Sequence, residues 1–396
     1  MNRPLVVMVS GAGWDGVRGS ERQLTEALAE RVDVLWADPP VSPATPARFR
    51  GLEHTSRHWR PALAAVAPGI LRFTPVALPG LTRPWIRGTT WPLVRAQLRG
   101  VLRRSGRTPD AVICCTPHEV LGYWGEGVRQ VLYGTDDWLA GAELMGLDAR
   151  VIAVAERSAV RAADLVLAVT PELAQRWQRL GAEPVEFPNG CDPDAHRGCV
   201  PATLPDGFPA EVAGVSGQLS DRIDIRLLEA VADTGIGLLL VGPLDPRWLP
   251  VRVASLLERD NVHHTGPVPF ERLGPWIARF DVGLTPYANT PFNRASFPLK
   301  TLEYLAAGKP VVATDLPASR RLQYETREIQ LAVEPESFAL AVLDAVRLPP
   351  LPTAIAQRRA VAERHSWRAR ACQLLDLLFP SLEEDPVDSR DASAAR

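Results

Sequence analysis

The sequence predicts an α/β protein with two doubly wound, mostly parallel sheets. Short apolar runs alternate with segments of helical periodicity through both halves of the chain, which is the pattern of repeated βαβ units. A stretch at residues 192–209, with four prolines and little apolar pattern, separates the halves. The chain has 396 residues, 46% of them hydrophobic, which is enough for two cores and too many for one ordinary core.

Charge and cysteine usage narrow the classes of partner and compartment. The formal net charge is -2 at pH 7, so the overall charge gives no reason to expect nucleic acid. The five cysteines are an odd number, with Cys114 and Cys115 adjacent in a predicted strand, which is not a disulfide framework; no spacing resembles a zinc site. The first apolar run is too short for a signal peptide and no run approaches the ~20 residues of a membrane span, so we expect a cytoplasmic protein.

The first half contains five buried-strand patterns. We expect strands at residues 4–10, 32–37, 110–115, 130–133 and 164–169, and helices at 20–30, at 149–163 and after Thr170. The loop after the first strand contains Gly13 and Asp15, and its glycines allow the backbone to approach a ligand closely.

Polar residues follow the third and fourth strands of this half, where α/β sheets bind ligands. They are His118 and the adjacent Asp136 and Asp137. Each also has a structural interpretation, since lone histidines are often structural and adjacent acids can cap the following helix.

A basic region lies between the second and third strands. Residues 48–107 contain 12 Arg against one acid, with Trp59, Trp85 and Trp91 interspersed. Around residues 94–103, apolar residues share one helix face and Arg95, Arg99 and Arg103 line the next. Such a helix can sit on an anionic membrane surface, which would give peripheral contact with the inner face of the cell membrane. We favour the other interpretation, a surface helix packed on the first domain by its apolar face, because amphipathicity is the default for any surface helix.

The second half repeats the alternation. Strands are expected at residues 212–215, 237–241, 261–264, 281–285, 311–313 and 329–333, with helices at 224–233, 271–279, 337–347 and 354–378. Residues 380–396 are charged and rich in Ala and Ser, so we expect a disordered tail.

One stretch, residues 293–314, reads as loop, helix, turn and strand. Pro298 suits the first turn of the helix, Gly308 ends it, and Lys300 lies in its first turn with Glu303 one turn further. Free amides around Pro298 and Leu299, the positive helix end and the Lys300 ammonium together suit a diphosphate. The Glu303 carboxylate can accept hydrogen bonds from ribose hydroxyls. Alternatively, Lys300 is a solvated residue of an ordinary αβ unit.

This stretch resembles the nucleotide-sugar site of GT-B glycosyltransferases, in particular retaining family 4 enzymes and their teichuronic-acid-type relatives. The resemblance rests on residues 303–314, Glu-Tyr-Leu-Ala-Ala-Gly-Lys-Pro-Val-Val-Ala-Thr, together with Asn-Gly-Cys-Asp at 189–192, Tyr-Gly-Thr-Asp-Asp at 133–137 and the loop at residues 14–22. Glu303 matches the second Glu of the family's Glu-x7-Glu motif. The first Glu falls on Ala295, which is a departure from the family pattern.

The resemblance implies a GT-B fold, with two Rossmann-like domains facing a central cleft. It places an acceptor-side domain at residues 1–191, a linker at 192–209, a nucleotide-sugar domain at 210–360 and a last helix at 361–379 that crosses back to the first domain. The implied donor-site residues are Lys300 and Arg222 at the diphosphate, Ser216 in the turn beside it, Glu303 at the ribose, and Gly242 and Gly266 near the base. Gly13 would lie at the cleft, His118 at the donor sugar, and Asp15, Asp136 and Asp137 on the acceptor side.

The resemblance also implies a reaction: transfer of a hexosyl-type sugar from a nucleoside-diphosphate sugar, retaining and without a metal or other cofactor. For Arg222, Asp221 and Asp224 nearby leave open that it is only ion-paired. The acceptor is open between an envelope polysaccharide, a lipid-linked molecule and a small natural product; the Arg, Ala and Pro bias suggests a bacterial source.

Two other functions fit the same residues. A sugar-nucleotide epimerase or hydrolase uses the same kind of cleft, and Asp136 and Asp137 could supply its acid and base. A sugar-nucleotide-binding partner without turnover fits the Ala295 departure, because a fold alone does not establish chemistry.

Overall fold

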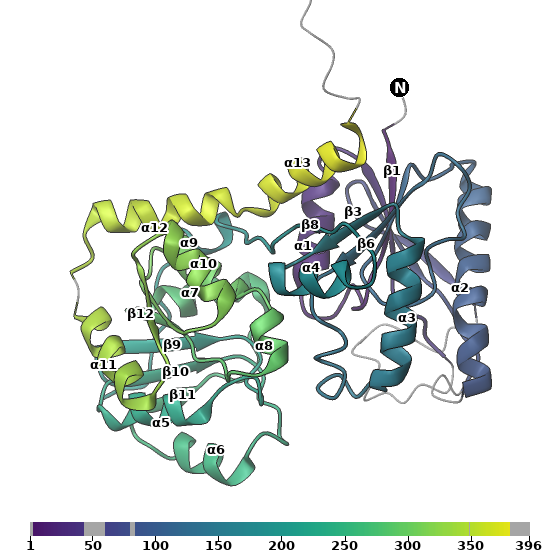
Figure 1. The fold of residues 1–396 in the computed structure, drawn as a ribbon. Helices are drawn as coiled ribbons and strands as arrows, with labels where there is room; N and C mark the ends of the chain where they lie inside the picture. The colour runs from purple at the N-terminus through teal and green to yellow at the C-terminus, as the bar shows by residue number, and fades with distance from the viewer. Residues whose placement is uncertain (1–2, 43–59, 80–83, 348, 381–396) are drawn as a thin grey trace, which may run out of the picture.

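The computed structural model describes residues 3–42, 60–79, 84–347 and 349–380 of the chain. Apart from Pro380, the predicted tail lies outside the described residues, as does part of the basic region. Two sheets lie side by side, and the last two helices, in yellow, run across the top of both in Figure 1.

The first sheet has eight strands in the order β3-β4-β2-β1-β5-β6-β7-β8. All neighbours pair in parallel except β3 and β4, which form an antiparallel edge. The strands are β1 (Leu5–Val9), β2 (Asp33–Ala37), β3 (Ala62–Ala67), β4 (Ile70–Thr74), β5 (Ala111–Cys114), β6 (Arg129–Gly134), β7 (Leu165–Ala168) and β8 (Val185–Glu186). Its helices are α1 (Ser20–Leu28), α2 (Pro84–Ser105), α3 (Ala149–Ala162) and α4 (Pro171–Gln178).

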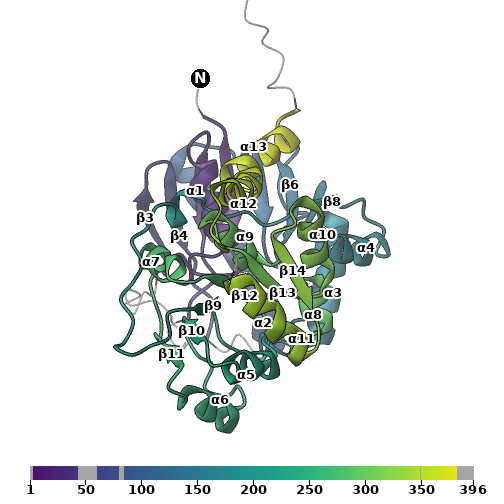
Figure 2. The same cartoon turned by 90° about the vertical axis from the view of Figure 1, so that its left-hand side faces the viewer.

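The second sheet has six strands, all parallel, in the order β11-β10-β9-β12-β13-β14. The strands are β9 (Val212–Ser216), β10 (Gly237–Val241), β11 (Val262–His264), β12 (Val282–Thr285), β13 (Val311–Thr314) and β14 (Ile329–Ala332). The helices are α5 (Ile225–Asp233), α6 (Pro250–Leu257), α7 (Leu273–Ala278), α8 (Pro291–Ala295), α9 (Leu299–Ala306), α10 (Pro317–Glu325) and α11 (Pro335–Val346). Figure 2 looks onto this second domain.

The predicted alternation of strands and helices is confirmed because it reflects burial. Every residue of β1, β5, β7, β9, β10, β12 and β13 is buried, as expected for parallel strands covered on both faces. The helix starts follow their caps: Asp148, Thr170 and Asp224 each accept a backbone N–H of the first turn of α3, α4 and α5.

The helix predicted at residues 354–378 is two helices, α12 (Pro352–Arg364) and α13 (Trp367–Leu378). The Ser366 hydroxyl caps α13 by accepting the Ala369 N–H at 3.2 Å. At the break, Cys191 N donates to His365 O and Trp367 N donates to Cys191 O, both at 2.9 Å. The chain therefore crosses between the domains twice at one place, once before the linker and once at residues 365–367.

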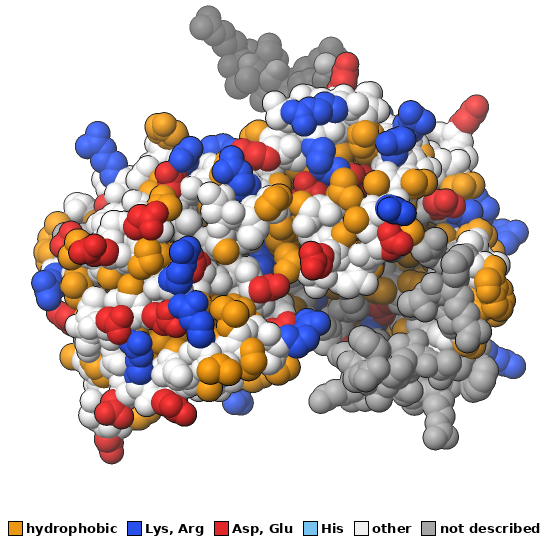
Figure 3. All heavy atoms as spheres, turned by 60° about the horizontal axis from the view of Figure 1, so that its bottom comes forward, with side chains coloured by type: hydrophobic (Ala, Val, Ile, Leu, Met, Phe, Trp, Pro, Cys, Tyr) orange, Lys and Arg blue, Asp and Glu red, His pale blue; other side chains and the backbone are white. Residues whose placement is uncertain are grey.

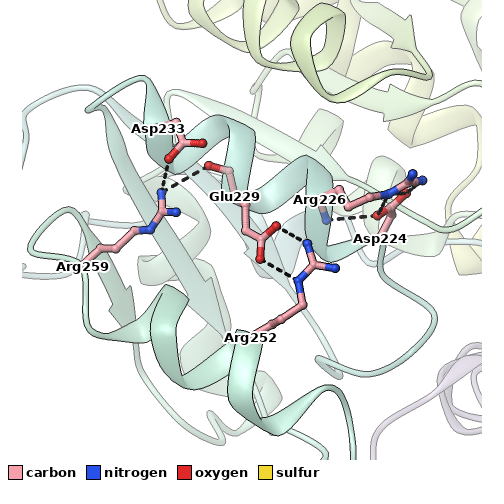
Figure 4. A network of polar contacts seen from close by, with 6 residues as sticks. All are labelled: Asp224, Arg226, Glu229, Asp233, Arg252 and Arg259. Carbon is pink, nitrogen blue, oxygen red and sulfur yellow. Dashed lines mark hydrogen bonds and ion pairs between the residues drawn. The ribbon is translucent and has the colours of Figure 1, made fainter.

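Several elements carry no clear periodic signal in the sequence. The β3–β4 edge, α6, α8 and α10 are short, and α8 replaces the loop predicted at residues 293–295. On the outer surface, α6 packs on α5, and Arg252 of α6 binds the Glu229 carboxylate of α5 (Figure 4). Such exposed ion pairs fix orientation more than they add stability.

Two arginines of the basic helix make contacts inside the first domain. Val94, Leu98, Val101 and Leu102 of α2 are buried as predicted. However, the Arg95 guanidinium lies 3.5 Å from the centre of the Tyr123 ring and donates to Glu119 O, and Arg99 donates to Tyr123 O. Two of the three arginines of the predicted basic face are therefore used in packing within the first domain.

The surface shows no single-sign patch in the view of Figure 3, where acidic and basic side chains are interspersed. This mixture agrees with the near-neutral net charge. Among the described residues, no helix has both the length and the apolarity that crossing a membrane would need.

Candidate functional site

Two cavities lie between the domains. Cavity A, about 840 Å³, has one wall from the first-domain loop at residues 15–18 and Arg22, and the other from Lys300 and the loops after β9, β10 and β11. Cavity B, about 830 Å³, lies between Asp136, Ala140 and residues 143–145 of the first domain and Arg222, Arg247, Trp248 and Phe292 of the second. Gln218 lines both, so the cavities adjoin at the turn after β9.

Two glycines shape this turn. Gly242 has φ +136°, and a Cβ there would lie 2.1 Å from Gly217 O, so only glycine lets the loops after β9 and β10 touch. Gly217 has φ +122°, and a Cβ there would lie 3.2 Å from Lys300 Cε. The aliphatic part of the Lys300 side chain therefore passes close to the backbone of Gly217. Gly266 supports Gly242 by accepting its N–H at 3.1 Å and lies behind the cavity wall.

Lys300 and Glu303 are brought together as an ion pair. The Lys300 ammonium lies 2.8 Å from Glu303 Oε2, and Glu303 is 2% exposed. Lys300 faces cavity A, whereas Glu303 is behind it and is already occupied by the lysine. The simple solvated role for Lys300 is therefore wrong, since its partner is a buried carboxylate one helical turn away.

The amides predicted around Pro298 and Leu299 are less available than the sequence suggested. Pro298 is the N-cap of α9 rather than its first helical residue, and Leu299 N donates to Phe297 O at 2.9 Å. The Leu299 side chain packs against the core of the first domain. Ser216 is also occupied, because its N–H and hydroxyl both lie within hydrogen-bond distance of the Tyr304 hydroxyl.

Arg222 is held in place for cavity B. Its Nε donates to Asn293 Oδ1 at 3.1 Å, Asn293 Nδ2 donates back to Arg222 O at 2.9 Å, and the guanidinium lies over the Phe292 ring. Asp224, one of the two acids that the sequence offered as ion-pair partners of Arg222, binds Arg226 instead. Sequence reasoning missed Asn293, which is 3% exposed; its place at the start of the stretch at residues 293–314 is a signal that could have pointed to it.

The adjacent acids separate into two roles. Asp136 lines cavity B, and burial raises its pKa to about 6, with the Arg222 cation opposing the shift and Asp137 adding to it. Asp137 does not face the cavity: it accepts Ala140 N at 2.9 Å and binds Arg176 at 3.0 Å. The helix-cap interpretation is wrong for both acids, because Asp148 caps the following helix α3 and Asp137 closes a turn instead. The cleft interpretation describes the position of Asp136.

Three other predicted residues lie in the first domain, and one of them faces a cavity. Asp15 lines cavity A and binds Arg72 at 2.6 Å, while Gly13 supports the same loop by accepting the Gly16 N–H at 3.0 Å. His118 follows β5 and stacks on Trp91 of α2, with ring centres 4.6 Å apart. His118 lines neither cavity, so the structure does not bring it to the Lys300 side of the cleft.

Sequence reasoning also missed the carboxylate of Glu21. Glu21, in the first turn of α1, accepts hydrogen bonds from the Ser10 hydroxyl and from Gly11 N at 2.9 Å. Burial raises its pKa to about 7, and the charge on Asp136 contributes to that shift. Within the described residues, no group of three or more His, Cys, Asp or Glu side chains could hold a metal ion.

Part of the chain matches a known protein family. Residues 219–347 match the family described as glycosyl transferases group 1. TuaH of Bacillus subtilis, named as a teichuronic acid biosynthesis glycosyltransferase, is 37% identical over 114 residues, which is 28% of this chain and 28% of that protein. The curated relatives that the chain matches are covered over only 28% to 56% of their length.

Solved structures match nearly the whole chain. Sucrose-phosphate synthase from Thermosynechococcus elongatus superposes with a TM-score of 0.70 at 18% identity, covering 96% of this chain and 99% of that one. Anabaena HepE in complex with UDP-glucose superposes with a TM-score of 0.63 at 18% identity, covering 95% and 99%. These likenesses confirm the predicted GT-B fold of two Rossmann-like domains.

The position that departs from the family pattern lies at the contact between the domains. Ala295 is buried at the end of α8, and its carbonyl accepts the Thr170 hydroxyl of the first domain at 2.8 Å.

Proposed function

We propose that this chain, a GT-B protein of the glycosyl transferases group 1 type, transfers a sugar from a nucleoside-diphosphate sugar to an acceptor. The observation that carries the proposal is the glycine-backed turn at residues 216–218, which places Lys300 in cavity A and Arg222 in cavity B on either side of Gln218. A diphosphate spanning the turn would meet one cation from each cavity. The binding of UDP-glucose by HepE supports this class of donor.

In this proposal the Lys300–Glu303 ion pair rearranges when the donor binds. Without donor, the buried Glu303 carboxylate neutralises the ammonium at 2.8 Å. We propose that a bound diphosphate draws Lys300 toward cavity A, so that Glu303 becomes available to the ribose hydroxyls. In this exchange the ammonium gains the diphosphate as its partner and the carboxylate gains hydrogen bonds from the ribose hydroxyls, which matters because a carboxylate at 2% exposure without any partner is strongly unfavourable.

The reaction in this proposal needs no protein nucleophile. Negative charge grows on the leaving diphosphate as the glycosidic bond breaks, and Lys300 and Arg222 stabilise it electrostatically. Arg222 is held in place by Asn293, and the stem of Lys300 passes close to the Gly217 backbone. We propose a metal-independent transfer with retention at the anomeric carbon, which the anomeric proton coupling of the product would test.

The first experiment is a thermal-shift panel of UDP, GDP, dTDP, ADP and their sugars on wild type, Lys300→Ala and Glu303→Ala. A ligand that binds only the folded state raises the melting temperature. We expect one diphosphate series to stabilise wild type and both variants to lose most of the shift. Full transferase activity in Lys300→Ala would show that the diphosphate assignment is wrong.

Acceptor assays separate the remaining functions. Transfer to a lipid-linked acceptor together with sedimentation on anionic vesicles would support peripheral membrane contact, whereas transfer to a soluble acceptor alone would remove the need for it. Turnover of the donor without any acceptor would favour a hydrolase or epimerase. Donor binding without turnover would favour a binding partner.

A further inference from the structure

Cavity B has a cation and an apolar region, and the Phe292 ring joins the two. The Arg222 guanidinium lies 4.8 Å from the centre of this ring. A Cβ added to Gly141 would lie 2.7 Å from the same ring and 3.0 Å from Met145 Cε, so the ring and the methionine methyl both lie against Gly141. The Phe292 ring therefore links Arg222, the proposed phosphate contact, to the apolar Met145.

The apolar region of cavity B is open to solvent. Met145 is 41% exposed and the neighbouring Leu144 is 39% exposed, and both line the cavity. Pro291 and Trp248 add apolar lining from the second domain. Sites for small molecules combine apolar walls with a few polar groups, so this lining suits a ligand that carries an apolar part.

The polar residues of cavity B are mostly acidic. Arg247 is already paired with Asp245 at 2.8 Å, and the proposed diphosphate would neutralise Arg222. Three carboxyl groups then remain: Asp136, Glu143 and Asp221. Within the part of the chain that the structure describes, no hydrogen bond or close ion pair engages these three side chains. They can accept hydrogen bonds from ligand hydroxyls and would repel a ligand with negative charge.

The two cavities are large enough to bind two molecules side by side. Cavities A and B measure about 840 and 830 Å³, and each is within the roughly 300–1,000 Å³ of a single small-molecule site. The proposed nucleoside would occupy cavity A, which Lys300 lines. Cavity B, beyond the turn at Gln218, is then left for a second molecule.

We propose that cavity B binds the acceptor, and that this acceptor is a hydroxyl-bearing molecule with an apolar tail and no negative charge. This inference rests on the proposed glycosyl transfer. The reacting hydroxyl lies near Arg222, and the tail packs against Phe292, Met145 and Leu144.

This placement agrees with retention at the anomeric carbon. Because Arg222 lines cavity B, an acceptor there approaches the anomeric carbon from the side of the bound phosphate, where a single displacement with retention takes place. The acceptor oxygen bonds to that carbon while the bond from the carbon to the phosphate oxygen breaks. The phosphate oxygen keeps the electron pair of the broken bond and takes the acceptor proton, so no carboxylate base is needed.

The first test measures binding of three probes to the full chain by isothermal titration calorimetry, with and without UDP. The probes are methyl β-D-glucoside, phenyl β-D-glucoside and phenyl β-D-glucuronide. We expect the phenyl glucoside to bind roughly tenfold more tightly than the methyl glucoside, because its ring is buried in cavity B. With UDP present at pH 8, it should also bind more tightly than the glucuronide. Burial raises the pKa of Asp136 only to about 6, so this carboxyl is charged at pH 8.

The double variant Leu144→Gln, Met145→Gln tests the tail. It should bind phenyl and methyl glucosides alike and bind UDP-glucose as wild type does. Leu340→Gln is the matched control, because Leu340 of α11 is 57% exposed and lines neither cavity. This control should keep the preference for the phenyl glucoside.

The double variant Glu143→Gln, Asp221→Asn tests the charge. With UDP present, we expect it to bind the glucuronide about fivefold more tightly than wild type, because two of the three repelling carboxylates are gone. Glu336→Gln, at an exposed residue of α11 outside both cavities, should bind the glucuronide as wild type does.

Transfer assays then identify the source of the tail. Glucose transfer from UDP-glucose to phenyl glucoside in solution would assign a small aglycone. Transfer only to hexadecyl β-D-glucoside in neutral phosphatidylcholine vesicles would assign a lipid.

Equal binding of methyl and phenyl glucosides to wild type would overturn the inference, and so would an unchanged preference in Leu144→Gln, Met145→Gln. If UDP binds in the same experiments, the proposed function still stands. A preference for the phenyl glucoside without binding of any nucleotide would support the apolar site and overturn the proposed donor.

Discussion

Glu21 gives the molecule a pH response at the level of one residue. Its pKa is raised from 4.5 to about 7 because burial disfavours the charged form. The folded protein therefore holds this proton more tightly than the unfolded chain. The resulting stabilisation is fully present below pH 4.5 and is lost as the pH rises through about 7.

We expect wild type to lose up to about 3 kcal/mol more stability than Glu21→Gln between pH 5 and pH 8, because glutamine does not titrate. Urea unfolding of both proteins at pH 5, 6, 7 and 8 measures the difference. Parallel pH dependences in wild type and variant would contradict a raised pKa at this position. Glu30→Gln is the control, because Glu30 is exposed and pairs with Arg368 at the surface.

Gly242 sets the geometry of the donor site through backbone contact alone. A methyl group there would meet Gly217 O at 2.1 Å on a backbone with φ +136°. We expect Gly242→Ala to lower the melting temperature by several degrees and abolish the thermal shift with UDP-glucose, since the loops after β9 and β10 must separate. Gly235→Ala, also at positive φ but with open space around it, is the control, and it should lose some stability and keep binding. Equal binding in Gly242→Ala and wild type would contradict this role.

At the scale of elements, α13 belongs to the core of the first domain although it follows the second in sequence. Trp367, Ala371, Leu374 and Leu378 are buried with α1 and the first sheet, and Trp367 also packs against Gly190. The two crossings at Cys191 and residues 365–367 are hydrogen-bonded to each other, so we expect the linker and the last helix to move together if the domains rotate.

Trp367→Ala should destabilise the first domain by about 3 to 5 kcal/mol, because it removes a buried aromatic side chain and leaves a cavity. Chemical denaturation followed by tryptophan fluorescence and circular dichroism would report the loss. Trp85→Ala provides the comparison, since Trp85 is 71% exposed and its removal should change stability little. An effect of Trp367→Ala below about 1 kcal/mol would mean that α13 is not part of the core.

At the scale of the molecule, contacts on the rim hold the domains close. Glu172 of α4 and Arg321 of α10 form a bidentate ion pair at 3.0 Å, and the Arg18 guanidinium lies 4.3 Å from the centre of the Phe270 ring. The Gly141 backbone meets the Phe292 ring so closely that a Cβ there would lie 2.7 Å from it. In the proposed glycosyl transfer, closure of this kind would exclude water from the site.

Arg321→Glu places two carboxylates opposite each other and should open the cleft. We expect a larger radius of gyration by small-angle X-ray scattering and a larger decrease on adding UDP-glucose than in wild type. The second domain itself should stay folded, because the Arg321–Glu172 pair is only partly buried. Identical scattering from variant and wild type would indicate that this pair does not hold the domains together.

Much of the fold could be predicted because parallel strands buried on both faces leave a continuous apolar run, as in Leu5–Val9 and Val311–Thr314. The short α8 and the β3–β4 edge could not, since neither has enough residues to show a period. The break between α12 and α13 depends on hydrogen bonds to Cys191, more than 170 positions earlier, which no local pattern records.

The sequence by itself determined the two-domain α/β fold and the positions of Lys300, Glu303 and Arg222, because residue order along strands and helices is a local property. Only the tertiary structure decided which charges meet. Lys300 pairs with Glu303, Asp137 with Arg176, and Glu21 anchors at the end of β1 with Asp136 acting on it. The physical reason is that burial and charge neighbours set the state of an ionisable group, and both arise only when distant segments pack together.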